Sequence, residues 1–496
     1  MGRAMATDIE PVFVLTGSLN ESEEDCRHPD KAFVLTFNYA QVDVNNDCRG
    51  SEGAFNLELP EGSAFLQIHD AHIAELPLGF RLAFSPFAPA GPSVLSPAAW
   101  ERWQSFASPQ LLVESVDFAL AEQALIHPYG AVPKPTTTQP ETLTAWLHIT
   151  NACNLDCPYC YVRKSSARMN ETTGRQAIES VFWSAQKNGF RRVKLKYAGG
   201  EATLHFSLVR RLHAHACKLA AEMGLGLNEV VLSNGVHIRP EDADWLVAEG
   251  IKLMISVDGV SELHDQLRFQ KNGEGSFDRV AHTMDQVLLP RGLRPDVTMT
   301  VTRLNASGVA DVARWALIER GLPTSFNLYR QNILSASRTD LALEETSIID
   351  GMLAAYAVIE AQLPLQPFFN GLLDRVQAEA HSHTCGVGQS YVVITHTGKL
   401  AQCQMHLDSP VSSVLPDDLL PLVADGPLRN MSVDDKYGCR DCEFRYRCSG
   451  GCPLETFRAT GRWDVQSPNC HIYKTLLPAA LRLEGLRLLK AHGYVS

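Results

Sequence analysis

The sequence lacks the features that place a protein in a membrane or on a nucleic acid. No run of about eighteen apolar residues, the length a membrane-spanning helix needs, occurs among its 496 residues. No basic block occurs either, and 56 Asp and Glu against 44 Lys and Arg give a formal charge of -12. Attraction to polyanions needs clustered positive charge, so we expect no nucleic acid partner and no membrane partner.

The start of the chain also lacks targeting signals. Residues 1–10 contain no apolar core of a secretory signal, and Ala6 stands where a myristoylation motif needs Ser or Thr. We therefore expect a cytoplasmic protein. In that reducing compartment, thirteen cysteines indicate metal or redox chemistry rather than disulfides. Ten of them fall into two groups, whereas Cys26, Cys48 and Cys217 are scattered and are expected to be structural.

The first cysteine group follows an apolar run at 143–149 that is typical of a buried strand. Cys153, Cys157 and Cys160 are spaced CxxxCxxC on the loop after this strand. Three thiolates on such a loop can hold three irons of a 4Fe-4S cluster and leave the fourth iron to a small chelating molecule. A zinc site would need a fourth ligand, and no Cys or His follows nearby. Three buried structural cysteines are the alternative, although packing does not select this spacing.

Strand and helix patterns alternate along the chain. Residues 11–95 contain short apolar runs between turn residues, for example 12–15, 32–37 and 65–68. Ser96 and Pro97 begin one predicted helix, a second spans 111–126, and a Pro-rich linker covers 133–140. Six strand–helix repeats follow, with strands at 143–149, 193–198, 230–232, 253–257, 297–301 and 324–329, and helices at 172–188, 206–223, 240–249, 276–289 and 308–319. This alternation predicts an α/β fold with a parallel sheet, whose ligands bind at the carboxyl ends of the strands.

Polar residues follow these strands. Gly199-Gly200-Glu201 ends the second strand, where Glu201 can accept hydrogen bonds from an ammonium group. Ser256 ends the fourth strand, and Arg268, which can pair with a carboxylate through two nitrogens, follows it. The alternatives are a tight turn for the glycines and a surface position for Arg268.

The second cysteine group has seven members between residues 385 and 470. Cys385 is followed by Gly398 and Cys403, then by Cys439-x2-Cys442-x5-Cys448-x3-Cys452, and finally by Cys470. A zinc ribbon at Cys439 and Cys442 would leave Cys385, Cys403 and Cys470 unexplained.

The CxxxCxxC loop with an aromatic residue before its last Cys resembles the signature of the radical S-adenosylmethionine (SAM) enzymes. The seven later cysteines resemble the SPASM extension of that family, which holds two auxiliary 4Fe-4S clusters. The resemblance covers about residues 145–475 and implies three 4Fe-4S clusters and SAM as cofactors. It implies a partial (β/α)6 TIM-like barrel, followed by a cysteine-rich SPASM domain. The strands and helices before the barrel weakly resemble a winged-helix-like α+β module that recognises peptides, with a purely structural cap as the alternative.

On this resemblance the chain divides into the N-terminal module at 1–132, a linker at 133–142, the barrel at 143–332, a helical connection at 333–384, the SPASM domain at 385–474 and a C-terminal helix at 475–496. Glu201 with Gly199 and Gly200 would bind the amino group of SAM, and Ser256 with Arg268 its carboxylate. Tyr159 would pack near the adenine, and Asn305 is a looser candidate for SAM binding.

The resemblance also assigns the cysteines. Cys153, Cys157 and Cys160 would hold the SAM-binding cluster. The first auxiliary cluster would be held by Cys385, Cys403 and Cys452, and the second by Cys439, Cys442, Cys448 and Cys470. Some relatives supply an eighth Cys shortly after the first of the seven, but residues 386–391 contain none. The first auxiliary cluster would therefore have an open iron or another ligand, such as His383.

The resemblance implies a maturase that abstracts hydrogen from a ribosomally made precursor peptide and forms an oxidative crosslink. Its electron donor would be a flavodoxin or ferredoxin. A radical SAM dehydrogenase or sulfatase-type maturase is the alternative, although Gln404 stands where sulfatase maturases carry Asp. A non-catalytic iron–sulfur electron carrier would need no SAM pocket. Asp374, His406 and Asp408 are weak candidates for the catalytic base.

Overall fold

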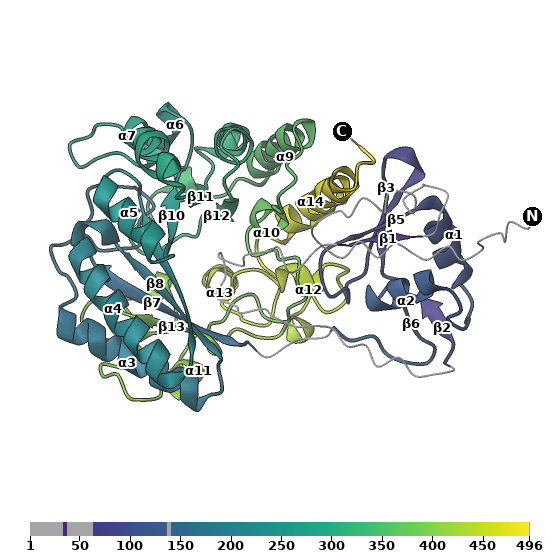
Figure 1. Cartoon of the computed structure of the whole chain (residues 1–496), viewed down its shortest axis with the longest axis horizontal. Helices are drawn as coiled ribbons and strands as arrows, with labels where there is room; N and C mark the ends of the chain where they lie inside the picture. Colours follow the sequence, from purple (N-terminus) through teal and green to yellow (C-terminus); the bar gives the residue numbers. More distant parts are fainter. Residues whose placement is uncertain (1–32, 37–62, 136–139, 496) are drawn as a thin grey trace, which may run out of the picture.

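The computed structural model describes residues 33–36, 63–135 and 140–495. Figure 1 shows a large sheet with its helices on the left, a region of short helices and loops in the centre, and a smaller α+β module on the right. The strand expected at 12–15 and the cysteines Cys26 and Cys48 lie outside the described residues.

The N-terminal module, described at 33–36 and 63–135, contains two small antiparallel sheets. The first has the order β1-β5-β4-β3 and comprises β1 (Val34–Leu35), β3 (His72–Glu75), β4 (Arg81–Phe84) and β5 (Ser93–Leu95). The second pairs β2 (Phe65–Gln67) with β6 (Ile126–Pro128). Ser96 caps α1 (Pro97–Ser105), as predicted, because its hydroxyl accepts a hydrogen bond from the backbone of Ala99. The winged-helix likeness of this module stays a prediction.

The second predicted helix of this module is shorter than expected. The periodicity predicts a helix over 111–126, whereas α2 spans Ser115–Glu122. Glu114 and Asp117 form a reciprocal capping box, so the helix begins at Ser115 rather than at residue 111. Asp117 is fully buried and pairs with Arg102 on α1 at 2.7 Å, which fixes the two helices against each other.

The main sheet contains all six predicted strands, and they are parallel. They are β7 (Thr142–Thr150), β8 (Arg192–Gly199), β9 (Gly226–Ser233), β10 (Lys252–Ser256), β11 (Asp296–Val301) and β12 (Thr324–Leu328). The whole sheet has the order β12-β11-β10-β9-β8-β7-β13-β14. Its last two strands, β13 (Tyr391–Ile394) and β14 (Leu400–Ala401), come from the cysteine-rich region and were not expected from the sequence. β13 pairs parallel to β7, so the cysteine-rich region extends the sheet.

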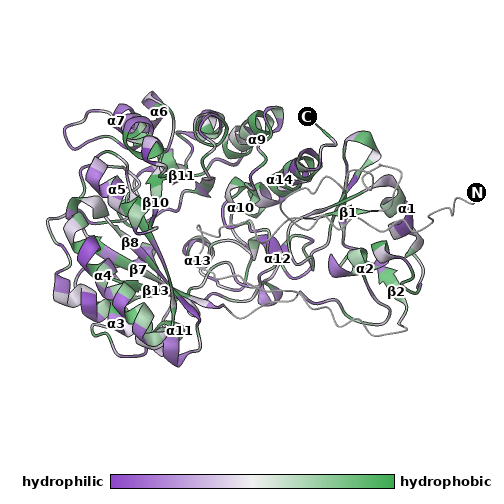
Figure 2. Cartoon of the chain, in the orientation of Figure 1, coloured by the Kyte–Doolittle hydropathy of each residue, from purple (hydrophilic) through white to green (hydrophobic). Residues whose placement is uncertain are grey.

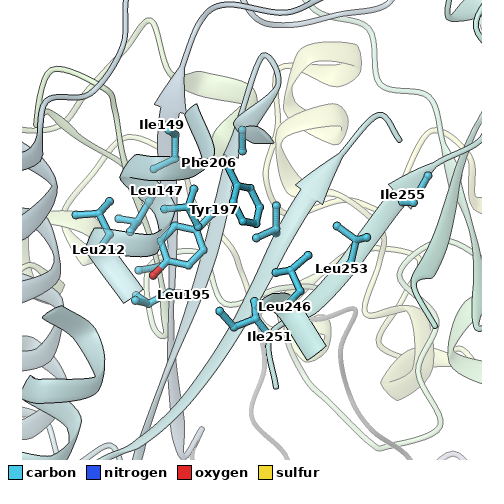
Figure 3. Close-up of a cluster of buried hydrophobic side chains, with 14 of the residues drawn as sticks. Leu147, Ile149, Leu195, Tyr197, Phe206, Leu212, Leu246, Ile251, Leu253 and Ile255 are labelled. Atoms are coloured by element: carbon cyan, nitrogen blue, oxygen red, sulfur yellow. The ribbon is translucent and has the colours of Figure 1, made fainter. Parts of the chain in front are cut away.

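Helices cover one face of this sheet and bury its main core. They are α3 (Glu171–Lys187), α4 (Phe206–Met223), α5 (Pro240–Ala248), α6 (Glu262–Leu267), α7 (Phe277–His282) and α8 (Val309–Val312). Beyond α7 and α8 the predicted helices continue as wider π turns, at Thr283–Leu288 and Ala313–Ile318. Figure 3 shows the core between strands and helices, with Leu147, Tyr197 and Leu253 fully buried or nearly so. In Figure 2 the outer helices α3 and α4 carry hydrophilic residues, whereas β10 and β11 are mainly hydrophobic.

A second core joins the two ends of the chain. The sequence predicts a mostly helical connection at 333–384, but only α9 (Glu345–Ala361) and α10 (Phe369–Leu372) are α-helical there. The remaining helices are α11 (Leu420–Ala424), α12 (Arg445–Cys448), α13 (Pro453–Thr460) and α14 (Cys470–Ala491). α14 packs against α9 and against the N-terminal sheet. At Gly485 of α14, an added Cβ would lie 2.7 Å from Leu82 of β4, so glycine permits this close packing.

None of the helices within the described part of the chain is both long and apolar enough to cross a membrane.

Candidate functional site

The CxxxCxxC loop leaves β7 and is held against the end of β8 by backbone contacts. Gly200 donates a hydrogen bond to the carbonyl of Thr150 at 2.6 Å, and Glu201 donates to that of Ala152 at 2.8 Å. A Cβ on Gly199 would lie 2.4 Å from the Thr150 oxygen, and one on Gly200 would lie 2.4 Å from the Ala152 oxygen. The glycines thus allow strand and cysteine loop to approach each other.

The three thiols of this loop share a buried, partly positive environment. Burial raises the pKa of Cys153, Cys157 and Cys160, while the positive charge of Lys164 opposes the rise at all three. Backbone N–H groups donate to two of the sulfurs, from Leu155 to Cys153 at 3.4 Å and from residue 162 to Cys160 at 3.5 Å. Thiols that burial keeps protonated, but that already accept hydrogen bonds, are suited to a metal that displaces their protons.

Glu201 occupies the centre of the predicted SAM site and is buried. Its Oε1 accepts hydrogen bonds from the backbone and hydroxyl of Thr203, at 3.2 and 2.7 Å, and its Oε2 accepts from the Asn234 backbone at 2.7 Å. Burial raises the pKa of Glu201, and these hydrogen bonds oppose the rise. The Ser233 side chain also hydrogen-bonds this carboxylate. An ionised carboxylate has about four acceptor sites, so an ammonium group would share or replace one of these donors.

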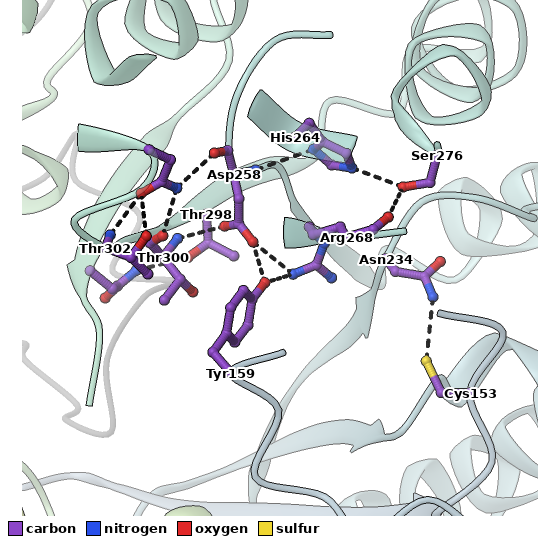
Figure 4. A network of polar contacts seen from close by, with 12 residues as sticks. Cys153, Tyr159, Asn234, Asp258, His264, Arg268, Ser276, Thr298, Thr300 and Thr302 are labelled. Carbon is purple, nitrogen blue, oxygen red and sulfur yellow. Dashed lines mark hydrogen bonds and ion pairs between the residues drawn. The ribbon is translucent and has the colours of Figure 1, made fainter. Parts of the chain in front are cut away.

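Tyr159, Asp258 and Arg268 form one buried group (Figure 4). The Tyr159 hydroxyl donates to the Asp258 carboxylate, and Arg268 Nη1 donates to both partners, with 3.2 Å to Asp258. Burial raises the pKa of Tyr159 well above its usual range, so the phenol stays protonated. Asp258 also accepts from the backbone of Thr300 at 2.7 Å, and its carbonyl accepts from Asn305 at 2.7 Å.

The structure therefore brings most of the predicted SAM residues together at the carboxyl ends of β7 to β11. Sequence reasoning assigned no role to Asp258, which organises this site, although it lies in the same strand-end segment as Ser256. Ser256 itself is half-buried at the end of β10. Arg268 keeps a free donor, because its buried Nε has no hydrogen-bond partner among the described residues.

Cys385, Cys403 and Cys452 lie around one small apolar core that includes Trp146 and Val393. Burial raises the pKa of Cys403 to about 12, and the neighbouring Cys452 and Cys385 add to the rise. His383, the sequence candidate for a further ligand, bonds through Nδ1 to the hydroxyl of Ser382 at 2.9 Å.

Cys439, Cys442, Cys448 and Cys470 line one small cavity at the start of α14. Burial raises the pKa of Cys439 to about 11 and that of Cys448 to about 12. All eleven cysteines of the described chain are free of disulfides. Cys385, Cys403 and Cys452 thus lie near one another, and the other four cysteines line one cavity.

A cavity of about 760 Å³ lies between the barrel and the cysteine-rich region. It is lined by Tyr161 and Arg163 from the segment after the CxxxCxxC loop, by residues around Tyr329 at the end of β12, and by 405–409, Glu455 and Arg458 from the cysteine-rich region. The weak sequence candidates His406 and Asp408 line it. Asp374, the third, is not among the lining residues.

Asp374 lies instead in a buried charged group behind the cavity. Its carboxylate pairs with Arg330 and accepts a hydrogen bond from the Tyr473 hydroxyl at 3.0 Å. Burial and Arg330 lower the pKa of Arg375, but Asp374 and the thiols Cys385 and Cys452 raise it above its ordinary value. Sequence reasoning missed this group because Arg330, Asp374 and Tyr473 are far apart in the chain.

Comparison with known proteins shows which family the central part of the chain resembles. Residues 147–315 match the model of the radical SAM superfamily. The sporulation killing factor maturation protein SkfB of Bacillus subtilis is 26% identical over 298 residues, which are 59% of this chain and 68% of that protein. The PqqA peptide cyclase of Gluconobacter oxydans is 23% identical over 361 residues, 65% of this chain and 89% of that one.

A solved structure shares the fold. The structure of anSMEcpe with bound AdoMet and the Cp18Cys peptide aligns with a TM-score of 0.56 at 16% sequence identity. The alignment covers 70% of this chain and 99% of that chain.

Proposed function

We propose, from the premise that this chain is a radical SAM enzyme, that it is a maturase of a ribosomally made peptide. It would abstract hydrogen from the precursor and form an oxidative crosslink. The observation that carries the proposal is the cavity of about 760 Å³, which opens between the CxxxCxxC side and the segment after Cys403. Its volume lies within the range of ligand pockets, and its aromatic, aliphatic and charged side chains suit a peptide segment.

The comparisons support a peptide as the substrate. SkfB is named as a maturation protein and the Gluconobacter oxydans protein as a peptide cyclase. The anSMEcpe structure contains a bound peptide. In this chain, an N-terminal module that shares a core with α14 would present the precursor to the cavity.

The residues of the chain suit three 4Fe-4S clusters and SAM. Cys153, Cys157 and Cys160 would hold the SAM-binding cluster, and the later seven cysteines would hold two auxiliary clusters in the sets of three and four described above. The gathering of these thiols, with no disulfide among the described cysteines, supports this assignment. When bound, the first cluster and SAM supply a 5′-deoxyadenosyl radical.

The protein side chains bind and orient these groups. Glu201 would accept a hydrogen bond from the SAM ammonium group in place of one of its present donors, and the free Nε of Arg268 would donate to the SAM carboxylate. Asp258 would fix Arg268 and Tyr159 beside them, since it contacts both. Ser256 would bind the same carboxylate from the end of β10.

We also propose the domain limits predicted from the sequence, and two features of the surroundings in which the enzyme works. The electron donor would be a flavodoxin or ferredoxin, and the enzyme would work in the reducing cytoplasm. The first auxiliary cluster would have an open iron or a further ligand such as His383, since three cysteines surround its site. His383 is hydrogen-bonded through Nδ1, which leaves its Nε2 as the atom that could ligate.

The sulfatase-type alternative is less well supported by the structure. Sulfatase maturases resemble this chain but carry Asp at the position of Gln404. Here the Gln404 side chain accepts a hydrogen bond from the Tyr391 hydroxyl at 2.8 Å. A neutral amide in that position cannot take up a proton as a carboxylate does.

Co-expression with small open reading frames next to the gene, followed by mass spectrometry, tests the proposal. We expect one peptide to lose two hydrogens for each crosslink, and fragmentation to fail between the joined residues. The triple variant Cys153→Ala, Cys157→Ala, Cys160→Ala should leave the peptide unchanged. SAM cleavage without any change in such peptides, but with oxidation of a sulfatase peptide, would overturn the proposal in favour of the alternative.

A further inference from the structure

We infer that Glu455 is the catalytic base, which takes a proton from the peptide group that forms the new bond. The inference rests on the proposed function and names a residue for its unassigned proton-transfer step.

A crosslink that removes two hydrogens requires a base for a simple reason. One C–H bond breaks when the SAM-derived radical takes a hydrogen atom. One X–H bond on the partner group, where X is sulfur, nitrogen, oxygen or carbon, breaks as the C–X bond forms. The remaining electron would pass to an iron–sulfur cluster, which would supply the one-electron acceptor, and the remaining proton would pass to the base. A carboxylate accepts that proton and becomes a neutral carboxylic acid.

Glu455 has the geometry that this role needs. It lies in the first turn of α13, three residues after Cys452, and lines the cavity. Its Oε1 accepts a hydrogen bond from Asn469 at 3.1 Å. Its Oε2 is buried and has no hydrogen-bond partner in the described chain. Buried acceptors are rarely left unpaired, and this one can receive a proton from a group bound in the cavity.

The other carboxylates near the cavity are already engaged. Asp408, the only other carboxylate among the described lining residues, pairs with Arg163 at 3.2 Å, and both side chains are about 60% exposed to water. Asp374 is fully buried behind the cavity and bound by Arg330 and Tyr473. Asp374 does not line the cavity, and Asp408 is held in an ion pair that is open to water.

His406 is the remaining candidate for the catalytic base, because it lines the same cavity. Burial lowers its pKa, and the positive charge of Arg458 lowers it further, so the imidazole is a weak proton acceptor. Burial has the opposite effect on a carboxylate and raises the pKa of Glu455. Relative to their ordinary values, burial thus weakens His406 as a base and strengthens Glu455.

The charges around Glu455 are balanced. Arg330 and Arg375 lower its pKa, while Asp374 raises it, and Asn469 stabilises the ionised form through its hydrogen bond. Tyr473, which is buried, contacts Asp374 in the same group. Arg330, Arg375 and the Asn469 hydrogen bond thus favour the ionised form of Glu455, against burial and Asp374, and none of them binds its Oε2.

The test compares Glu455→Gln with Glu455→Asp, His406→Gln and Glu379→Gln. Glu379 is a matched control, since it too is a buried carboxylate with an unpartnered oxygen and a pKa raised by burial, but it does not line the cavity. The probe is the peptide that the wild-type enzyme crosslinks in co-expression. Each variant is reduced with dithionite in D₂O, and iron content, peptide affinity, 5′-deoxyadenosine and peptide mass are measured.

We expect Glu455→Gln to keep its iron, its peptide affinity and peptide-dependent 5′-deoxyadenosine. Crosslink formation should fall about 10²- to 10⁴-fold. Substrate radicals that cannot complete the reaction should be quenched by the reductant and return as uncrosslinked peptide carrying one deuterium. Glu455→Asp should restore part of the crosslinking, and Glu379→Gln should crosslink normally.

Two results would overturn the inference. Normal crosslinking by Glu455→Gln, with loss in His406→Gln, would assign the base to His406. Loss of iron or of peptide affinity in Glu455→Gln that Glu455→Asp does not restore would make Glu455 structural. If the wild-type enzyme crosslinks no peptide, the proposed function fails first, and that failure is distinguishable because it does not depend on Glu455.

Discussion

Two groups of buried polar side chains differ in how they are hydrogen-bonded: Glu201, Asp258 and Arg268 at the strand ends, which we call the barrel wall, and Glu455, Asp374 and Arg330, which we call the opposite wall and of which Glu455 lines the cavity. On the barrel wall, Glu201 and Asp258 each accept several hydrogen bonds from neighbouring strands and loops. On the opposite wall, Glu455 Oε2, Asp374 Oδ1 and Arg330 Nε are buried without partners among the described residues. The carboxylates of a site that holds one constant ligand can be pre-organised, with Arg268 Nε left to bind that ligand, whereas unpaired carboxylate oxygens remain available to a reacting substrate.

The difference suggests that the two walls bind different molecules. The barrel wall would hold SAM, which is the same in every turnover. The opposite wall would meet the peptide, whose groups change charge during the reaction. Variants on each wall should therefore fail in different steps.

The largest expected effect comes from removing the CxxxCxxC thiols. The triple variant Cys153→Ala, Cys157→Ala, Cys160→Ala should lose roughly four of roughly twelve irons, because one of three 4Fe-4S clusters is lost. SAM cleavage should fall below detection, while the absorbance of the auxiliary clusters remains. Iron analysis of the anaerobically reconstituted protein measures this. An unchanged iron count would contradict the assignment of these cysteines.

Asp258→Asn should produce the next largest effect and act on the barrel wall. It leaves the buried guanidinium of Arg268 without its counter-charge, which costs about 3–5 kcal/mol. We expect weaker SAM binding, measured by equilibrium dialysis, and a lower free energy of unfolding, measured in denaturant. Asp311→Asn is the control, since its pair with Arg314 is half-exposed and should contribute at most about 1 kcal/mol.

Asp374→Asn makes the matching change on the opposite wall. It removes the carboxylate that pairs with Arg330, at a cost of about 3 kcal/mol, since the nearby Glu455 still compensates part of the charge. SAM affinity and uncoupled 5′-deoxyadenosine formation should stay at wild-type values, while crosslinking falls. A loss of SAM affinity as large as in Asp258→Asn would show that the two walls are not independent.

The sequence predicts the barrel wall better than the opposite wall. Six strands follow from apolar runs, Glu201 could be placed because it comes directly after a strand, and Arg268 was assigned from the family resemblance. Asp258 was missed although it is local, since Ser256 beside it matched the expected pattern. The group of Arg330, Asp374, Glu455 and Tyr473 could not be predicted, because it depends on how β12, α13 and α14 pack together. The pairing of β13 with β7 could not be predicted either, because strands that are far apart in the sequence leave no periodic signal of their pairing.

Gly200→Ala should give the smallest effect and tests how tightly the barrel wall is built. The added Cβ would lie 2.4 Å from the Ala152 carbonyl, so the cysteine loop must shift, at about 1–3 kcal/mol. We expect lower iron retention in the first cluster during dialysis, with the auxiliary clusters intact. Gly226→Ala is the matched control, because its Cβ would meet only the flexible side chain of Arg192, at 3.2 Å. Equal iron retention in both variants would show that the loop is not fixed by its contact with β8.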